Sequence, residues 1–117
     1  MSDFKNLISQ KNGIERIIAM PKFSTPFSGK KCDRKLTKEE LLRTIRFMVA
    51  SEYEAIQLYM QAAESTDNEN AAKIFREVAD DERVHAGCFI KLLFMLDADE
   101  KKLYLDGFDE VNEILEQ

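Results

Sequence analysis

The sequence is poor in cysteine and has no long apolar run. Its two cysteines, Cys32 and Cys88, stand far apart and match neither a disulfide-rich scaffold nor the ligand spacing of a zinc site. This pattern favours a reducing, cytoplasmic compartment. No apolar run is long enough to span a bilayer, and the first residues lack the hydrophobic stretch of a secretory signal. The sequence therefore predicts no membrane association.

Basic residues are outnumbered by acidic ones. The chain has 17 Lys and Arg against 22 Asp and Glu, which gives a formal net charge of -5. A nucleic-acid-binding surface needs clustered positive charge to replace phosphate counterions, so this balance argues against a nucleic-acid partner. Small cations are more natural ligands for such a protein.

Proline and glycine are scarce and unevenly placed. Both prolines and two of the four glycines lie within residues 1–35, which are predicted to be an N-terminal leader of unknown role. Residues 36–97 are predicted to form an antiparallel two-helix hairpin, and residues 98–117 a short C-terminal helical segment. A chain of 117 residues is ordinary for one domain, and it shows no β alternation and no repeat. The predicted fold class is all-α.

The start of the hairpin is marked by capping chemistry. Thr37 followed by Glu40 has the spacing of a capping box, with Leu36 and Leu41 at the positions of a hydrophobic staple. The turn residues at 65–68 are predicted to end the first helix and to supply the N-cap of the second.

The same chemistry recurs at the end of the hairpin. The second helix is predicted to run to about Leu96. Asp97 and Glu100 repeat the capping-box spacing, so another helix is predicted to start there. Gly107 is expected to end that helix after a few turns.

Each predicted hairpin helix carries an apolar stripe that ionisable residues interrupt. On the first helix the stripe, at steps of three and four, is Ile45, Val49, Glu52, Ile56, Tyr59 and Ala63. On the second helix it is Phe75, Val78, Glu82, His85, Phe89, Leu92 and Leu96. Two carboxylates and the only histidine are therefore predicted to point inward from facing helices.

Three inward ionisable groups indicate a metal site. An unpaired carboxylate in an apolar core costs several kcal/mol, unless it is neutralised, paired or bound to a metal. No Lys or Arg lies on either stripe. Carboxylate and imidazole ligands suit iron or manganese, with zinc possible, whereas calcium does not need the histidine. The alternative is a structural polar cluster in which Glu82 and His85 form a buried ion pair.

The predicted ligand set is half of a known kind of centre. Di-iron carboxylate bundles use one Glu from each of two helices and a Glu-x-x-His from each of the other two. This chain supplies Glu52 and the pair Glu82 and His85 from two long helices. We therefore expect two chains to meet across a two-fold axis and complete a four-helix bundle.

The stretch from Glu52 to Ile114 resembles the encapsulated ferritins, ferritin-like proteins that reside in encapsulin nanocompartments. The resemblance extends from about residue 36 to the C-terminus. It is carried by Glu52 with the pattern A-I-x-L-Y behind it, by Glu82 and His85 thirty and thirty-three residues later, and by the tail LDGFDEVNE.

This resemblance implies a ferritin-like fold of two-helix subunits, which complete four-helix bundles by dimerising and form a ring-shaped homodecamer. It implies a di-iron centre shared between two chains, with Glu52, Glu82 and His85 as iron ligands and Glu82 as the bridging carboxylate. Tyr59 matches a tyrosine close to the centre and is counted with the catalytic residues, although a core aromatic is an equal alternative. Glu54 matches an acidic position outside the centre.

The implied activity is that of a ferroxidase, which oxidises Fe(II) to Fe(III) and supplies iron for storage in an encapsulin-type compartment. An encapsulin shell protein is then a candidate partner, and the expected location is the cytoplasm, inside such a compartment. Two alternatives stay open. One is a rubrerythrin-like protein that reduces peroxide at a di-iron site, and the other is a non-catalytic helical-bundle adaptor whose polar residues fix the dimer register.

Overall fold

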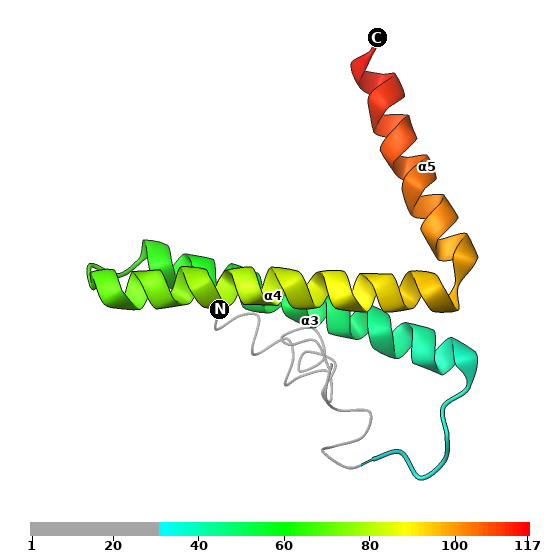
Figure 1. Ribbon diagram of the computed structural model, residues 1–117, viewed down its shortest axis with the longest axis horizontal. Helices are drawn as coiled ribbons and strands as arrows, with labels where there is room; N and C mark the ends of the chain where they lie inside the picture. Colours follow the sequence, from blue (N-terminus) through cyan, green and yellow to red (C-terminus); the bar gives the residue numbers. More distant parts are fainter. Residues whose placement is uncertain (1–30) are drawn as a thin grey trace, which may run out of the picture. The chain divides into compact units, whose positions relative to one another are not determined.

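The structure, a computed structural model, describes residues 31–117. This part contains three helices, α3 at Lys38–Glu64, α4 at Glu69–Leu96 and α5 at Ala98–Leu115, and no strand (Figure 1). The all-α fold class is therefore confirmed. The predicted leader, residues 1–35, lies largely outside the described residues. None of the three helices combines the length and the apolar character needed to cross a bilayer.

Helix α3 begins at the predicted capping box. The Thr37 hydroxyl accepts a hydrogen bond from the Glu40 backbone N–H at 3.2 Å, and the Glu40 carboxylate accepts one from the Thr37 N–H at 2.9 Å. Both bonds satisfy N–H groups that have no partner within the helix. The start of the hairpin is therefore determined by a local signal that can be read from the sequence.

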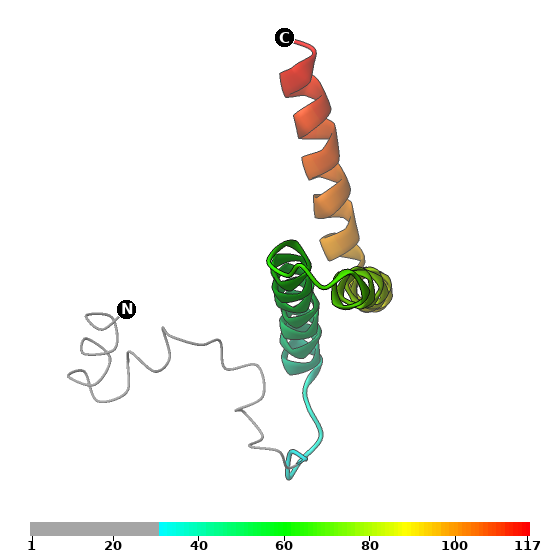
Figure 2. The ribbon, with the colours of Figure 1, turned by 90° about the vertical axis from the view of Figure 1, so that its left-hand side faces the viewer.

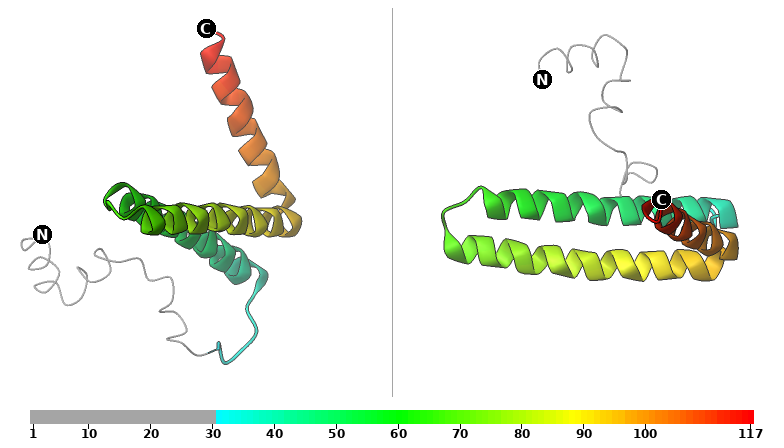
Figure 3. Two further views of the ribbon diagram at one scale, coloured as in Figure 1. Left: turned by 60° about the vertical axis from the view of Figure 1, so that its left-hand side comes forward. Right: turned by 90° about the horizontal axis from the view of Figure 1, so that it is seen from above.

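The loop between α3 and α4 also follows the sequence. The Asn68 side chain caps α4 by accepting a hydrogen bond from the Ala71 N–H at 2.9 Å, and the Thr66 hydroxyl accepts one from the Asn68 N–H at 3.1 Å. The two helices lie side by side and antiparallel (Figure 3). With 27 and 28 residues, each is about 40 Å long.

The seam between α3 and α4 is built from small side chains. The buried apolar residues of the described chain are Leu42, Ile45, Ala63, Ala72, Ala79, Ala86 and Leu93. The three alanines of α4 and Leu93 recur every seven residues, so the helices meet along a line of small side chains. Alanine permits close approach, and larger side chains are then displaced to the flanks of the contact.

The stripe predicted for α4 is consequently only partly buried. Phe89 and Leu96 pack against the core cluster of Leu42, Ile45 and Leu93, whereas Phe75 is half-buried and Leu92 is 40% exposed. The sequence pattern was read from large apolar residues, whereas the seam itself is defined by alanines. One flank of the hairpin therefore remains open, with apolar side chains along it.

Helix α5 is longer than predicted. Gly107 does not end it, because the helix continues through this residue to Leu115 and spans 18 residues. A glycine ends a helix when it adopts a left-handed conformation, whereas here the apolar spacing continues with Phe108 and Val111. A glycine inside a helix costs about 1 kcal/mol relative to alanine, which this helix tolerates.

The first turns of α5 are fixed to the hairpin. Asp97 caps the helix as predicted, but the second half of the capping box is absent, because the Glu100 carboxylate instead accepts hydrogen bonds from Arg46 of α3, at 3.1 Å from Nε, and from the Tyr104 hydroxyl at 2.7 Å. The Tyr104 ring also meets Phe94 of α4 edge to face, at 5.2 Å between centroids. Beyond this junction α5 leaves the hairpin (Figure 2).

Candidate metal centre

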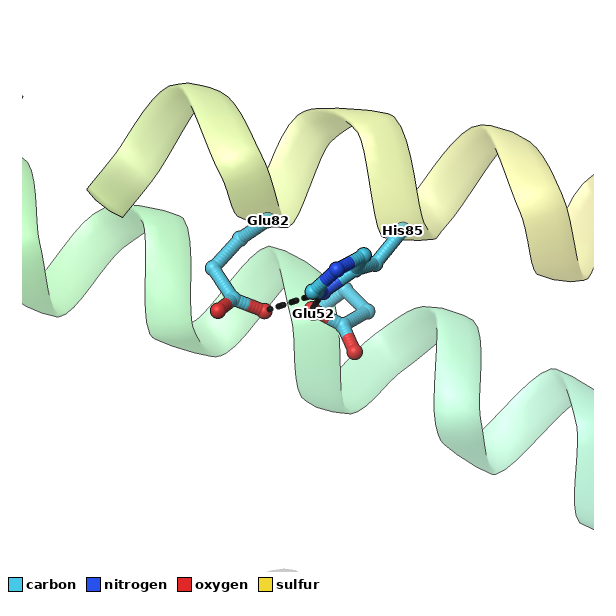
Figure 4. Close-up of side chains that lie close together, drawn as sticks. All are labelled: Glu52, Glu82 and His85. Atoms are coloured by element: carbon cyan, nitrogen blue, oxygen red, sulfur yellow. Dashed lines mark hydrogen bonds and ion pairs between the residues drawn. The ribbon is translucent and has the colours of Figure 1, made fainter. Parts of the chain in front are cut away.

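The three predicted ligands come together at the middle of the hairpin. Glu52 projects from α3, and Glu82 and His85 project from α4 toward it (Figure 4). A spacing of three residues puts Glu82 and His85 on the same side of α4, nearly one turn apart. One potential ligand atom from each of the three residues lies within 4.8 Å of those of the other two.

The imidazole lies close to both carboxylates. His85 Nδ1 is 3.4 Å from Glu82 Oε2 and 3.8 Å from Glu52 Oε2. The first distance permits a weak hydrogen bond, and the second is the separation of an ion pair when the imidazole is protonated. Within residues 31–117, neither carboxylate forms an ion pair with a Lys or Arg side chain. The cluster therefore carries an excess of negative charge.

Burial differs across the cluster. The Glu52 and Glu82 side chains are only 16% and 19% exposed, whereas the His85 side chain is 54% exposed. The prediction that both carboxylates point inward is confirmed. The prediction that His85 does so is wrong for the single chain, because His85 lies on the open flank of the hairpin rather than on the alanine seam. An imidazole placed there can meet a group from a second molecule.

One oxygen of the cluster is buried without a hydrogen-bond partner. Glu52 Oε2 is inaccessible to solvent and accepts no hydrogen bond. Buried polar atoms are nearly always satisfied, and an unsatisfied one costs about 1–3 kcal/mol. A proton or a cation held between the carboxylates would remove this cost.

The two carboxylates titrate differently because they interact. When Glu52 takes up a proton, it forms a hydrogen bond with Glu82, which raises the pKa of Glu52; burial and the negative charge of Glu82 raise it further, against the opposing effect of His85. The same hydrogen bond, and then that with His85, lower the pKa of Glu82 although its partial burial opposes this. A divalent cation bound here would neutralise both carboxylates and take the place of the shared proton.

The donor set fits a transition-metal ion. Two carboxylates and one imidazole are ligands that iron and manganese accept, and zinc accepts them too. The unsatisfied Glu52 oxygen is the observation of this chain that favours an ion over a purely structural cluster. Three donor groups leave positions on a metal ion free, so one chain provides an incomplete coordination shell.

The comparison with known families agrees with this geometry. The rubrerythrin family profile matches residues 45–113, which include all of the cluster. The chain belongs to the rubrerythrin family. It is thus a ferritin-like protein, as its sequence pattern indicates.

Relatives of this rubrerythrin-family chain have encapsulin-related names. It is 40% identical over 82 residues to the ferritin-like–encapsulin shell fusion protein of Pyrococcus furiosus, covering 70% of this chain and 24% of that protein. It is 43% identical over 67 residues to the encapsulin nanocompartment cargo protein EncC of Myxococcus xanthus, covering 57% of this chain and 52% of that one. The chain therefore spans about a quarter and about half of the lengths of these two relatives.

A solved structure extends the match to three dimensions. The crystal structure of the encapsulated ferritin domain from Pyrococcus furiosus aligns with a TM-score of 0.70 and 38% identity, covering 74% of this chain and 88% of that one. The resemblance to the encapsulated ferritins that the sequence indicated is thereby confirmed.

Two other residues named from the sequence lie apart from the cluster of this rubrerythrin-family chain. Tyr59 is half-buried on α3, two helical turns after Glu52, and its hydroxyl makes no hydrogen bond to the three ligand side chains. Glu54 is exposed. The sequence reasoning missed the seam residues Ala79 and Ala86, which are 0% and 4% exposed and lie within three residues of Glu82 and His85 in the sequence. Their seven-residue spacing was the available signal.

Proposed function

We propose that this protein is a ferroxidase that oxidises Fe(II) to Fe(III) at a di-iron site shared between two chains, each supplying Glu52, Glu82 and His85. The observation that carries the proposal is the convergence of these three donors within 4.8 Å around a buried carboxylate oxygen that has no hydrogen-bond partner. The chain also belongs to the rubrerythrin family, whose members are di-iron oxidoreductases. This membership supports iron as the metal.

Each side chain has a distinct task in this proposal. The Glu52 and Glu82 carboxylates bind Fe(II) and, as hard anionic ligands, favour Fe(III), which makes electron loss easier. The His85 imidazole is a neutral donor at the open side, so it adds a ligand without adding charge. Two Fe(II) ions each give up one electron, and dioxygen with two protons accepts them to form hydrogen peroxide. When hydrogen peroxide is the oxidant, the same two electrons and two protons give two water molecules.

A second chain completes the site. One chain offers one imidazole and two carboxylates, which is half of the ligand set used by four-helix di-iron bundles. His85 is half-exposed on an open flank that also carries apolar side chains, which is the arrangement expected of a two-fold contact. We therefore propose a homodimer around the site and, from the resemblance, a ring-shaped homodecamer of such dimers.

The partner outside the chain is an encapsulin shell protein. One relative is named as a fusion of a ferritin-like domain with an encapsulin shell, and another as an encapsulin nanocompartment cargo protein. We propose that this chain works inside such a compartment in the cytoplasm and supplies it with Fe(III) for storage. A closed shell is useful because Fe(III) is otherwise lost from solution as a precipitate.

A second candidate function uses the same residues. Rubrerythrin-family membership also favours a protein whose main task is peroxide removal, with Fe(II) regenerated by a reductant. The two functions differ in the preferred oxidant and in the fate of iron. A ferroxidase consumes Fe(II) in excess of the site, whereas a peroxidase reduces many peroxide molecules for each bound iron.

The experiment is anaerobic Fe(II) titration followed by mixing with dioxygen or hydrogen peroxide, with absorbance recorded over time. The Glu82→Ala and His85→Ala variants should bind little iron and lose at least tenfold in oxidation rate, while helicity by circular dichroism stays at the parental level. Glu54→Ala is the matched control, since Glu54 is an exposed carboxylate two residues from Glu52. Parental oxidation rates in both ligand variants contradict the proposed site and favour the adaptor alternative.

A further inference from the structure

A hydrogen bond between Tyr104 and Glu100 sets this tyrosine apart from the others in the chain. The chain has three tyrosines, Tyr53, Tyr59 and Tyr104, and no tryptophan. Tyrosine and tryptophan carry the aromatic rings that lose one electron most readily. Of the three tyrosine hydroxyls, only that of Tyr104 donates a hydrogen bond to another side chain within residues 31–117, and its acceptor is Glu100 Oε1 at 2.7 Å. Tyr104 is therefore the tyrosine that has a base in contact with its proton.

The Glu100 carboxylate is ionised and held in place by Arg46. Its hydrogen bonds with Arg46, and then that with Tyr104, hold the pKa of Glu100 below its usual value although burial opposes this. The hydrogen bond with Glu100 also raises the pKa of Tyr104, so the phenol keeps its proton at neutral pH. A neutral phenol thus donates to an anionic carboxylate, which is the shorter and stronger kind of hydrogen bond.

This arrangement makes the loss of an electron from Tyr104 easier. A phenol that loses one electron becomes a strong acid, and its proton must pass to a base. Glu100 can take that proton along the existing hydrogen bond, so no positive charge is left on the ring. The Arg46 side chain is 44% exposed, so water solvates its charge after Glu100 becomes neutral. The other tyrosines have to release the proton to water, and we expect Tyr104 to be oxidised in preference to them.

The pair of Tyr104 and Glu100 lies near the candidate metal centre. Arg46, which binds Glu100, precedes Glu52 by six residues on α3, a rise of about 9 Å. Tyr53 directly follows Glu52, and after Glu100 and burial it also contributes to the raised pKa of Tyr104, because two ionised phenols repel each other. Tyr104 is thus close enough to the iron ligands to exchange an electron with an ion held there, without touching that ion.

We propose that Tyr104 supplies one electron when hydrogen peroxide reacts at a site that holds a single Fe(II) ion. This role rests on the proposed ferroxidase activity and extends it to incomplete loading of the shared site. Reduction of hydrogen peroxide to two water molecules takes two electrons and two protons. The Fe(II) ion gives one electron and becomes Fe(III), and the Tyr104 ring gives the other and becomes a neutral radical. The Tyr104 proton goes to Glu100, and the solvent supplies the two protons that form water.

The next substrate ion restores the pair. A second Fe(II) ion gives one electron to the Tyr104 radical and becomes Fe(III), and the proton returns from Glu100 to the phenol oxygen. Both steps together oxidise two Fe(II) ions for each hydrogen peroxide, as a fully loaded site does. Without Tyr104, a single Fe(II) ion reduces hydrogen peroxide by one electron only and releases hydroxide and a hydroxyl radical. Oxidisable side chains of the protein, such as Met95, which is 70% exposed, are targets of that radical.

The first test is electron paramagnetic resonance of the full chain, loaded anaerobically with less Fe(II) than its sites can hold, mixed with hydrogen peroxide and frozen. The parent should give a tyrosyl radical signal, identified by its change when the protein contains ring-deuterated tyrosine. Tyr104→Phe should lower this signal at least fivefold, whereas the matched control Tyr59→Phe should keep it. At full loading Tyr104→Phe should oxidise Fe(II) at the parental rate, because two Fe(II) ions then supply both electrons.

The outcomes separate this role from the ferroxidase activity itself. A parental radical signal in Tyr104→Phe, or no radical in the parent while Fe(III) forms, overturns the role of Tyr104 and leaves the ferroxidase proposal standing. A slower rate for Tyr104→Phe at full loading assigns the residue a structural role instead. If the fully loaded parent forms no Fe(III), the ferroxidase proposal fails, and the role of Tyr104 at the site fails with it.

The second test needs no iron. Ruthenium(III) tris-bipyridine, generated by a light flash, removes one electron from the metal-free chain, and the tyrosyl radical is followed by absorbance. Exposure alone favours Tyr53, which is 52% exposed against 42% for Tyr104. Because Glu100 takes the proton, Tyr104→Phe should nevertheless lower the radical yield more than Tyr53→Phe, and oxidation of the parent should be slower in D2O than in H2O. A larger loss in Tyr53→Phe, or equal rates in the two solvents, refutes the preferred oxidation of Tyr104.

Discussion

Replacing Glu52 by glutamine tests the central feature of the candidate site, the buried carboxylate oxygen without a partner. Glutamine keeps the shape of the side chain, removes the charge and offers an N–H that can donate to Glu82. Because the Glu52 side chain is still 16% exposed, we take the lower end of the usual cost of an unsatisfied buried group, about 1 kcal/mol. The metal-free Glu52→Gln protein should therefore melt about 4 °C higher than the parent.

Metal should reverse the order of stability. A ligand at one hundred times its dissociation constant stabilises a protein by about 2.7 kcal/mol, so Mn(II), an air-stable stand-in for Fe(II), should raise the melting temperature of the parent by about 10 °C. The Glu52→Gln protein, having lost an anionic ligand, should gain far less. The parent is then less stable than the variant without metal and more stable with it.

The effect should also depend on pH with a defined sign. The pKa of Glu52 is raised in the folded chain, so its protonated form is favoured by folding. Below the unfolded pKa of about 4.3 the residue is protonated in both states, and the parent has no disadvantage. As the pH rises through the pKa of Glu52 in the folded chain, the parent must bury an ionised carboxylate, and its free energy of unfolding falls relative to that of the variant. The stability advantage of the metal-free variant should therefore be smaller at pH 4 than at pH 7.

The assay is thermal unfolding by circular dichroism at pH 4 and pH 7, with and without Mn(II), at one protein concentration. Glu54→Gln is the matched control, because it makes the same chemical change at an exposed residue two positions away and should match the parent in every condition. The reasoning fails if metal-free Glu52→Gln is less stable than the parent at pH 7, or if Mn(II) stabilises both equally.

Three further substitutions separate the parts of the molecule. Glu100→Gln weakens the charge-assisted hydrogen bonds to Arg46, which also hold the pKa of Glu100 low. Hydrogen exchange of the α5 amides should then accelerate about tenfold or more, while the amides of α3 and α4 stay protected. Equal acceleration in all three helices contradicts local anchoring of α5. Ala79→Leu overfills a fully buried seam position, so the free energy of unfolding should fall by about 1–3 kcal/mol. The Mn(II) affinity measured by calorimetry should fall too, because the helices separate beside Glu82. Unchanged Mn(II) affinity refutes a link between the seam and the metal site. His85→Ala should lose Mn(II) affinity yet keep metal-free stability within about 0.5 kcal/mol, since the ring is half-exposed, and a large loss of stability refutes that view.

The helix starts could be predicted because they depend on neighbouring residues. The capping box of Thr37 and the cap of Asn68 are local devices, and the structure forms both. The end of α5 could not be predicted in this way, because Gly107 can either end a helix or be tolerated inside one. The choice depends on whether the apolar spacing continues, and here it does as far as Leu115.

The convergence of the three donors was predicted because their spacing along two antiparallel helices brings them to the same level of the hairpin. The exposure of the His85 side chain was not predicted. Hydrophobic periodicity indicates only which side of a helix faces inward, and large apolar residues dominate the pattern. It does not separate the centre of the helix contact from its edges. The seam instead follows Ala79 and Ala86, whose small side chains carry little weight in such a pattern although they determine how closely the helices approach.

The alanine seam has a consequence for how the cell handles this chain. A hairpin whose buried residues include only three side chains larger than alanine gains little free energy from its own interior. In the proposed homodimer, contact with a second copy adds the stabilisation that one hairpin lacks, so the folded fraction should rise with the concentration of the chain. We expect unpaired chains at low concentration to open often and to be cleaved by proteases, and paired chains to be protected. Surplus copies should then be degraded without a dedicated recognition signal.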